Sequence, residues 1–338
     1  MLAAGAMRHH LGIMMTRTRR IAFQGDLGAN SHIACRDVYP DYDPLPFRTF
    51  EECFGALGDG TADLAMIPVE NSTAGRVADI HYLLPKSDVH IIGEFFLPVR
   101  HQLLGLPGAR LEAVKTARSH PQALDQCRNS LRELGITPEV ATDTAGSARE
   151  LAESGDESVA SIATTLAAEV YGLEILRENI EDEDHNTTRF IILSPENLRA
   201  APGVGPIVTT FVFGVRNIPA ALYKALGGFA TNGVNMTKLE SYMVGGQFTA
   251  TQFLADIDGH PDEPHVARAF EELGFFARCG CSVCTGPARS ASGSGLSGRW
   301  RGSESGDPRP PAPPRRPPPP RRDGAPPAPA PRRTGCRR

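Results

Sequence analysis

The sequence predicts an α/β protein made of two lobes, followed by a smaller α/β domain. Two observations predict this fold. Short apolar runs typical of buried strands end repeatedly in clusters of Gly, Ser, Thr or Asn, and each cluster opens a helical pattern. After about residue 195, a linker rich in Pro, Gly and Ala interrupts this series, and a new order of strands and helices begins.

The composition is that of a globular chain without a membrane span. The 338 residues are 41% hydrophobic and 22% charged, which suffices for two or three domains with real cores. No stretch approaches the ~20 apolar residues of a spanning helix. Residues 1–18 lack the apolar run and cleavage site of a secretory signal, so we expect a disordered extension there. The 7 Cys stand singly or near the end, which favours reduced thiols in the cytoplasm.

Charge is distributed unevenly along the chain. From Cys279 onward there are 12 Arg and 3 acidic residues, so this end carries about +9 and the remainder about −13, within a total of −4. A nucleic-acid interaction inferred from charge would rest on this end alone. We therefore expect neither nucleic acid nor membrane as a partner.

The first lobe places polar residues at the ends of its strands. The strand at 21–23 opens into the glycine loop 24–32, which ends in helix N-cap residues at Ser31. Backbone N–H groups at such a helix start suit a carboxylate or a phosphate. The strand at 64–69 ends directly on the polar sequence 70–72. The signal is weak by itself, because many βα loops share this pattern.

The segment from about 100 to 180 repeats the βα pattern and forms the second lobe. Its first strand precedes Ser119, and Pro121 fits the first position of a helix. The chain returns at 185–190, where His, Asn, two Thr and Arg precede a buried apolar run. The other interpretation of this return is a strand end with β-prone Thr and a solvated Arg. Two such lobes form a cleft for a small anion, as in periplasmic binding proteins, so the plan alone indicates a ligand rather than an enzyme.

Four motifs resemble those of the prephenate dehydratase family in content, order and spacing. They are Asn186–Phe190, Glu70–Ser72, Ser119–Gln122 followed by Gln126, and Asp143–Ala145. The resemblance covers roughly residues 19–278. The glycine loop departs mildly, because residues 24–31 lack the more usual Pro and Thr-Phe.

The resemblance implies a two-lobed, periplasmic-binding-protein-like catalytic domain at residues 19–194. Its reaction would convert prephenate into phenylpyruvate with loss of carbon dioxide and water, a step in the formation of L-phenylalanine. Aromatisation drives the decarboxylation, so no metal or cofactor is demanded. The enzyme has to hold two carboxylates and help the ring hydroxyl to leave.

The resemblance also assigns roles within the cleft. Thr188 would be the hydrogen-bond donor to the departing hydroxyl, and its high pKa means that it polarises this group without giving up its proton. Arg189, Asn71, Ser119 and Gln126 would orient that hydroxyl or the carboxylates. The other expected substrate-binding residues are Ser31, Ser72, Thr144, Ala145, Asn186, Thr187 and Phe190.

Three further titratable residues accompany these motifs. Glu70 would be a proton source, a charge that repels the dianion, or a helix cap. Water is the other possible proton source. A lone His is more often a structural hydrogen-bonding residue, so neither His120 nor His185 is expected to be the acid.

Residues 207–278 show the order βαββα, which is a ferredoxin-like unit without its last strand. Two of its strands are expected to form a hairpin across Gly245 and Gly246. The unit resembles an ACT domain, the amino-acid-sensing module of this family, which implies L-phenylalanine as an effector and a homodimer or homotetramer. The other interpretation is a purely structural dimerisation domain.

The ACT resemblance places the effector at the first loop and on the second strand. Its implied phenylalanine-binding residues are Asn217, Pro219, Ala220, Ala221, Leu222, Glu240 and Ser241. Tyr242 and Met243 stand where the family usually has Arg-Pro, which is a departure at the expected effector site.

Residues 279–338 contain no Lys, Ile, Phe, Tyr, Asn, Gln, Met or His. Several of these residue types have AT-rich codons, so their joint absence favours GC-rich DNA read out of frame. The alternatives are a Pro-rich ligand of SH3-like domains and a basic nucleic-acid arm. Cys279, Cys281 and Cys284 have no candidate fourth ligand at ordinary spacing, so no metal is expected. Such a composition stays disordered, and the preceding domain should lack an edge strand.

Two other functions compete with this enzyme. A non-catalytic protein with the same cleft would bind a small anion without turnover. An arogenate dehydratase would act on a substrate that carries an amine in place of the side-chain keto group of prephenate. The sequence does not favour prephenate over arogenate, or arogenate over prephenate, as the substrate.

Overall fold

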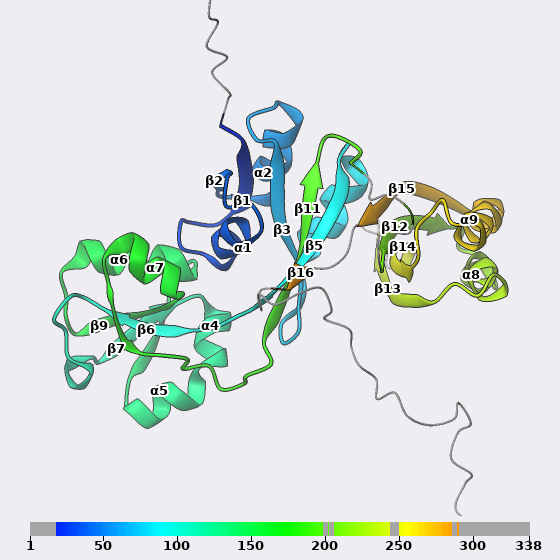
Figure 1. Cartoon of the computed structure of the whole chain (residues 1–338). Helices are drawn as coiled ribbons and strands as arrows, with labels where there is room; N and C mark the ends of the chain where they lie inside the picture. Colours follow the sequence, from blue (N-terminus) through cyan, green and yellow to red (C-terminus); the bar gives the residue numbers. More distant parts are fainter. Residues whose placement is uncertain (1–17, 199–201, 203–205, 244–249, 286–288, 291–338) are drawn as a thin grey trace, which may run out of the picture. The chain divides into compact units, whose positions relative to one another are not determined.

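The structure, a computed structural model, describes residues 18–198, 202, 206–243, 250–285 and 289–290. The expected N-terminal extension, the hairpin glycines Gly245 and Gly246, part of the linker and the chain beyond residue 290 lie outside the described residues. The described part contains three sheets, each with its own helices (Figure 1). None of the described helices is long and apolar enough to cross a membrane.

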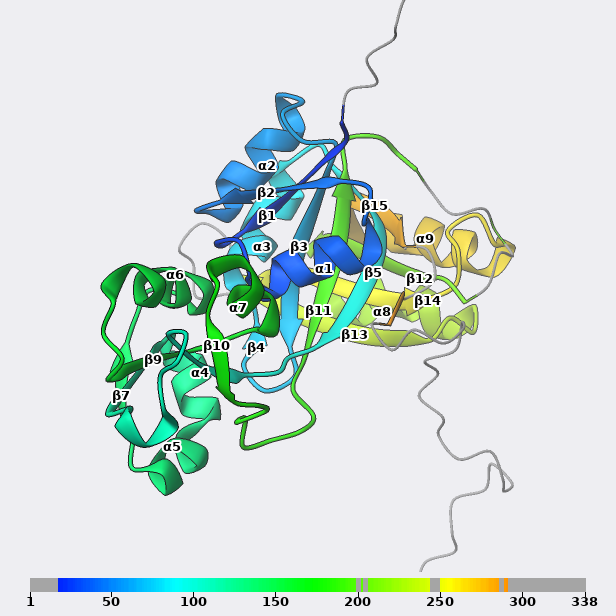
Figure 2. The same cartoon turned by 60° about the vertical axis from the view of Figure 1, so that its left-hand side comes forward.

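The first lobe is built on a 7-stranded mixed sheet. Its strands in spatial order are β16 (Arg289–Ser290), β5 (His90–Pro98), β11 (Thr187–Ser194), β3 (Leu64–Asn71), β1 (Arg20–Gln24) and β2 (Asp43–Phe47), and β4 (Gly75–Arg76) pairs with β3. Helix α1 (Asn30–Val38) packs on one face, whereas α2 (Phe50–Gly58) and α3 (Ala78–Leu83) cover the other (Figure 2). Because side chains alternate along a strand, Met66 of β3 joins the core under α1, and Ile67 joins the core under α2.

The second lobe is built on a 5-stranded sheet. Its strands in spatial order are β10 (Glu174–Arg177), β6 (Gln102–Gly105), β9 (Val159–Ala163), β7 (Thr116–Ser119) and β8 (Thr137–Val140), and its helices are α4 (Pro121–Gln126), α5 (Arg128–Leu134), α6 (Thr144–Ser154) and α7 (Thr165–Tyr171). The chain leaves the first lobe after β5 and returns at β11, and these two strands are antiparallel neighbours. The two segments that connect the lobes therefore join the first sheet side by side, at the end of β5 and the start of β11. The mixed α/β fold predicted from the sequence is confirmed.

The C-terminal domain has a 4-stranded antiparallel sheet in the order β13 (Met236–Met243), β14 (Ala250–Asp258), β12 (Val208–Val215) and β15 (Ala277–Thr285). Helices α8 (Ala221–Thr231) and α9 (Pro264–Phe276) share one core with Phe211, Phe213 and Phe253. Val212 and Leu254, whose side chains alternate with these, join the first-lobe core under α2 and α3.

The expectation of a missing last strand is wrong. β15 pairs with β12 from Ala277 opposite Val215 to Thr285 opposite Val208. β16, at residues 289–290, also pairs with β5 of the first lobe. The physical reason is that a ladder is formed by backbone N–H and C=O groups, which this segment supplies whatever its side chains are. Whether the end of the gene is read in frame stays a prediction.

Deleting β15 tests whether the domain depends on this strand. A variant that ends at Arg278 should lose several ladder hydrogen bonds, each with a net value of ~0.5–1.5 kcal/mol, and its free energy of unfolding should fall by at least about 2 kcal/mol. Thermal unfolding and amide exchange along β12 measure this change. A variant that ends at Ser290 is the matched control, and equal stability of the two variants would contradict a structural role for β15.

Candidate active site

A cavity of about 260 Å³ lies between the two lobes. The first lobe contributes Gln24, Gly25, Asn30, Ser31, Asn71 and Thr188, and the second contributes His120, Gln122, Gln126, Asp143 and Thr144. His101 and Asn186 enter from the two crossing segments, and Pro68, Val77, Val99 and Phe190 form an apolar wall. A hollow of about 450 Å³ elsewhere is lined by residues 118–150 of the second lobe alone. The cavity between the lobes is the better candidate, because polar groups from separate elements converge there.

The glycine loop closes one side of the cleft by touching the second lobe. Gly28 has φ +91°, and a Cβ there would lie 2.7 Å from the Cα of Ala167 in α7. Thr164 Oγ1 donates a hydrogen bond of 2.5 Å to the carbonyl of Gly28, and Tyr171 Oη donates one of 2.9 Å to that of Leu27. Glycine is required at position 28 both for its positive φ and for this close approach.

At the centre of the cleft, Asn71 and Thr188 face each other across β3 and β11. The Nδ2 of Asn71 lies 2.9 Å from the Oγ1 of Thr188. The Oδ1 of Asn71 accepts the backbone N–H groups of Thr73 at 3.1 Å and Ala74 at 2.8 Å. Because those two groups can only donate, the amide has one possible orientation, and Thr188 must accept from Asn71. The hydroxyl hydrogen of Thr188 is thus left to donate into the cleft.

The same argument determines which groups donate and which accept in the hydrogen bonds that follow. Asn71 Nδ2 also donates to Asn186 Oδ1 at 2.7 Å, so Asn186 must turn its Nδ2 toward Gln126 Oε1, at 3.1 Å. Gln126 Nε2 then donates to Thr73 Oγ1 at 2.8 Å. A chain of amides with matched donors and acceptors therefore joins the first lobe, a crossing segment and the second lobe.

His101 is the last member of this hydrogen-bonded series, and the sequence analysis did not identify it as a site residue. Its Nε2 lies 2.9 Å from Gln126 Oε1, which can only accept, so Nε2 carries the hydrogen. The side chain is 3% exposed, and burial lowers its pKa, which keeps the imidazole neutral. Nδ1 has no hydrogen-bond partner among the described residues. The sequence signal was only a single His before an apolar strand.

Helix starts and neutral donors supply the attraction for an anion. The first turns of α1, at Asn30 and Ser31, and of α6, at Thr144, line the cavity. His120 Nδ1 accepts the backbone N–H of Gln122 at 3.2 Å, so a neutral His120 carries its hydrogen on Nε2. The lining residues that the structure describes include no Lys or Arg. A carboxylate in this cleft would be held by dipoles rather than by a full positive charge.

Comparison with known proteins identifies the family. A family model described as prephenate dehydratase matches residues 21–198, which is more than half of the chain. The chain belongs to the prephenate dehydratase family. This finding confirms the family indicated by the four motifs.

Relatives and solved structures agree with this assignment. A protein of Komagataeibacter europaeus named bifunctional N-acyl-homoserine lactone acylase/prephenate dehydratase is 51% identical over 78% of this chain and 94% of its own length. The chloroplastic arogenate dehydratase/prephenate dehydratase 1 of Arabidopsis thaliana is 43% identical over 66% of this chain. This chain spans only 56% of that plant relative. The prephenate dehydratase of Arthrobacter aurescens, solved in complex with L-Phe, is 29% identical, with a TM-score of 0.71 over 78% of this chain and 89% of its own.

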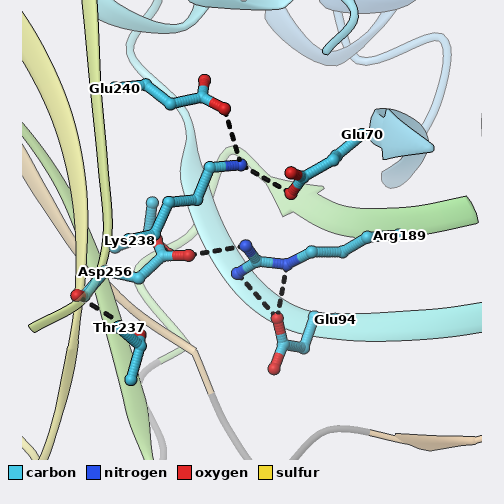
Figure 3. Close-up of polar contacts among 8 residues, drawn as sticks. Glu70, Glu94, Arg189, Thr237, Lys238, Glu240 and Asp256 are labelled. Carbon is cyan, nitrogen blue, oxygen red and sulfur yellow. Dashed lines mark hydrogen bonds and ion pairs between the residues drawn. The ribbon is translucent and has the colours of Figure 1, made fainter. Parts of the chain in front are cut away.

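Arg189 and Glu70 do not line the cleft of this prephenate dehydratase family member. Side chains alternate along a strand, so Thr188 and Asn71 face the cleft while Arg189 and Glu70 face away from it. Arg189 binds Glu94 at 2.8 Å and Asp256 of the C-terminal domain at 2.5 Å (Figure 3). The expectation that Arg189 orients substrate carboxylates is therefore not supported by its position. Glu70 likewise faces away from the cleft, where it binds Lys238, and is not placed to supply a proton.

Four other expected site residues lie outside the cavity lining, and they are Ser72, Ser119, Ala145 and Thr187. Ser119 is fully buried and donates to the carbonyl of Ile162 at 2.6 Å, so its hydroxyl holds β7 to β9. Ser72 Oγ donates to the carbonyl of His185 and accepts the backbone N–H of Thr187. Ala145 is a buried residue of the first turn of α6. Ser31, Asn71, Gln126, Thr144, Asn186, Thr188 and Phe190 are the expected residues that the structure brings together.

The expected effector residues lie on two parts of the C-terminal domain. Asn217, Pro219 and Ala220 are exposed in the loop between β12 and α8, where Ala220 has a φ of +63°, and Ala221 begins α8. Leu222 packs against the domain core. On β13, Glu240 turns toward Lys238, whereas the neighbouring Ser241 is exposed. The structure therefore separates the side chains of Glu240 and Ser241 onto two faces.

The buried, neutral state of His101 gives a prediction about pH. The unfolded chain takes up a proton as the pH falls below the ordinary pKa of about 6.5, while folded His101 resists protonation. Stability should therefore be lost between about pH 7 and pH 5, and His101→Gln should reduce this loss because Gln does not titrate. Urea unfolding at pH 7 and pH 5.5 measures the difference. The exposed His185→Gln is the control, and an unchanged pH dependence in His101→Gln would contradict the assignment.

Proposed function

We propose that the chain catalyses the conversion of prephenate into phenylpyruvate, carbon dioxide and water in the cleft between its lobes. The observation that carries this proposal is the fixed amide of Asn71, which leaves the hydroxyl of Thr188 as a donor into the cleft. A donor is what the departing ring hydroxyl needs. Membership of the prephenate dehydratase family supports the same reaction.

The chemistry requires few groups. The bond to the ring carboxylate breaks and releases carbon dioxide, its electron pair enters the ring, and the hydroxyl leaves from the opposite carbon. Thr188 donates a hydrogen bond to that oxygen as negative charge develops on it. A threonine hydroxyl is too weak an acid to transfer its proton readily, so a proton from water completes the leaving water molecule. This accounts for the product atoms without a contribution from Glu70.

The substrate carboxylates are held by the helix starts and by neutral donors. Ser31 and Thr144 mark the starts of α1 and α6, and His120 offers Nε2–H when neutral. The apolar wall formed by Pro68, Val77, Val99 and Phe190 suits the face of the ring. Gln126 and Asn186 keep Asn71 oriented and need not touch the substrate to be required.

A second candidate substrate is arogenate, which carries an ammonium group in place of the keto group. The carboxylate of Asp143 lines the cleft, and its Oδ1 caps α6 by accepting the backbone N–H of Gly146. A carboxylate at this place suits an ammonium group. The plant relative is named for both activities.

The C-terminal domain supports a regulatory role. Its order of strands and helices, β12-α8-β13-β14-α9-β15, is that of a ferredoxin-like unit. We assign it as an ACT domain with L-phenylalanine as the effector. The solved relative in complex with L-Phe supports this assignment. Exposed apolar residues of this domain favour self-association into a homo-oligomer, and they are Ile218, Tyr223, Leu239, Met243, Phe275 and Phe276. A cytoplasmic location suits the unpaired Cys35, Cys53 and Cys127.

Removing the hydroxyl of Thr188 tests the proposed reaction. Thr188→Ala should lower kcat on prephenate by roughly 10² to 10³-fold while the fold remains intact, which is the usual cost of losing one preorganised donor. Phenylpyruvate formation measures the rate, and circular dichroism checks the fold. Thr188→Ser keeps a hydroxyl and is the matched control. Near-normal turnover by the alanine variant, or no turnover by the unmodified chain, would refute the mechanism or the function respectively.

Replacing one carboxylate tests the choice between the two substrates. Asp143→Asn still caps α6, because Asn is as good an N-cap as Asp, but it removes the negative charge. If the ammonium of arogenate binds there, the ratio of kcat/KM for arogenate to that for prephenate should fall by about 10-fold, equal to ~1.4 kcal/mol. Both substrates are assayed with both proteins. An unchanged ratio would exclude Asp143 from substrate selection.

A further inference from the structure

Two ion pairs lie directly behind the Thr188–Asn71 pair, on the opposite face of the sheet. In the register of β11 against β3, Thr188 is opposite Asn71 and Arg189 is opposite Glu70. One pair of neighbours thus faces the cleft, and the next pair faces the C-terminal domain. Figure 3 shows Arg189 and Glu70 reaching toward residues of that domain.

The C-terminal domain presents a matching pair. Lys238 of β13 is opposite Asp256 of β14 in their own ladder. Lys238 Nζ lies 2.6 Å from Glu70 Oε2, and Arg189 Nη1 lies 2.5 Å from Asp256 Oδ2. Two adjacent positions of one sheet therefore face two adjacent positions of another, with opposite charges at both contacts. Displacing the β13–β14 pair would pull on β3 and β11 together.

These contacts are shielded from water and have further partners. The side chains of Arg189, Glu94 and Asp256 are 11%, 3% and 4% exposed. Arg189 also donates from Nε and Nη2 to Glu94 of β5, and Asp256 accepts from Thr210 of β12 at 2.7 Å. A buried charge network that is fully paired has little freedom, because any displacement leaves a charge unpaired.

The strand that carries Asn71, β3, is irregular at this point. Arg189 is opposite Glu70, whereas Phe190 is opposite Pro68, so the extra residue is Val69 of β3, next to Glu70. Such an irregularity loosens the local ladder and re-aims side chains, so the direction of Asn71, and with it that of Thr188, depends on what holds Glu70. The network behind the strand supplies that restraint.

We infer that Lys238 and Asp256 of the C-terminal domain are positioning residues for the reaction: through Glu70 and Arg189 they set the geometry of the Asn71–Thr188 pair. This inference rests on the function proposed above. It also gives the C-terminal domain a direct mechanical connection to the cleft. An effector that moves β13 would change the aim of the Thr188 hydroxyl without entering the cleft.

The test uses the Lys238–Glu70 contact, because its side chains are 14% and 37% exposed and its loss is less disruptive than loss of the buried Arg189 network. Glu70→Gln, Lys238→Met and the double variant are made in the full chain. Each should lower kcat by about 10-fold with KM within about threefold, because the donor is misplaced while the carboxylate contacts remain. The double variant should lose no more than Lys238→Met alone, since Lys238→Met already removes the contact with Glu70, together with the 3.3 Å contact with Glu240.

The matched control is Asp258→Asn. Asp258 lies two residues beyond Asp256 on the same strand and bonds Asn235 of its own domain at 2.7 Å, so this variant should keep the parent kcat. Unchanged kcat in folded Lys238→Met, a change confined to KM, or additive losses in the double variant would each overturn the inference.

A measurement without turnover separates this inference from the proposed reaction. The side-chain amide hydrogens of Asn71 should change their NMR shifts in Lys238→Met and not in Asp258→Asn, in the absence of substrate. If the unmodified chain has no turnover, the proposed function fails, and this shift still decides the structural connection. Unchanged Asn71 resonances in Lys238→Met would overturn the connection itself.

Discussion

The orientation of one side-chain amide, that of Asn71, determines the chemistry of the cleft. Two backbone N–H groups, of Thr73 and Ala74, hold its oxygen, so its nitrogen must face Thr188 and Asn186. No side-chain rotation can exchange these roles without leaving donors opposed. The direction of the Thr188 hydroxyl therefore follows from the backbone of the turn after β3. This is a form of preorganisation, because the donor is aimed before a substrate arrives.

The amide chain also ties this orientation to the arrangement of the lobes. Gln126 belongs to the second lobe and Asn71 to the first, and they are joined through Asn186. The cavity is narrow enough for such contacts because glycine at position 28 lets the loop lie against α7. Opening the lobes would break hydrogen bonds between neutral groups and two surface ion pairs, Arg36–Glu169 and Arg149–Asp26, which costs less than separating buried charges. The interdomain ion pair of Arg189 with Asp256, in contrast, is buried, so separating these two charges costs more free energy.

The sequence predicted well which segments come together at the cleft. It predicted less well which side chains of those segments face the cleft. Asn71 ends one buried strand and Thr188 begins another, so their place at a common edge could be predicted. Arg189 belongs to the same motif, but a strand turns alternate residues to opposite faces, and the motif was interpreted as one polar unit. Applying the strand period would have separated Arg189 from Thr188. The role of His101 could not be found in this way, because it depends on Gln126, which is distant in sequence and on another element.

The last strand shows a second limit of sequence reasoning. Composition after Cys279 predicted disorder, yet residues 277–285 pair with β12 along its whole length. β12 has apolar residues on both faces and needs a neighbour on each side, and the backbone of any extended segment can satisfy that need. Side-chain composition decides whether a segment can form its own core. It does not decide whether the segment can complete a sheet that already exists.

The absence of a guanidinium from the described cleft lining is consistent with the proposed reaction. The ring carboxylate of prephenate carries its charge in the ground state and loses it as carbon dioxide forms. A buried Arg against that group would bind the ground state more strongly than the transition state, and such binding raises the barrier. Neutral donors and helix starts hold the carboxylate less tightly while Thr188 stabilises the charge that grows on the hydroxyl. Turning Arg189 to the opposite face thus removes an inhibitory contact from the cleft, and its charge is used instead to hold the strand that aims Thr188.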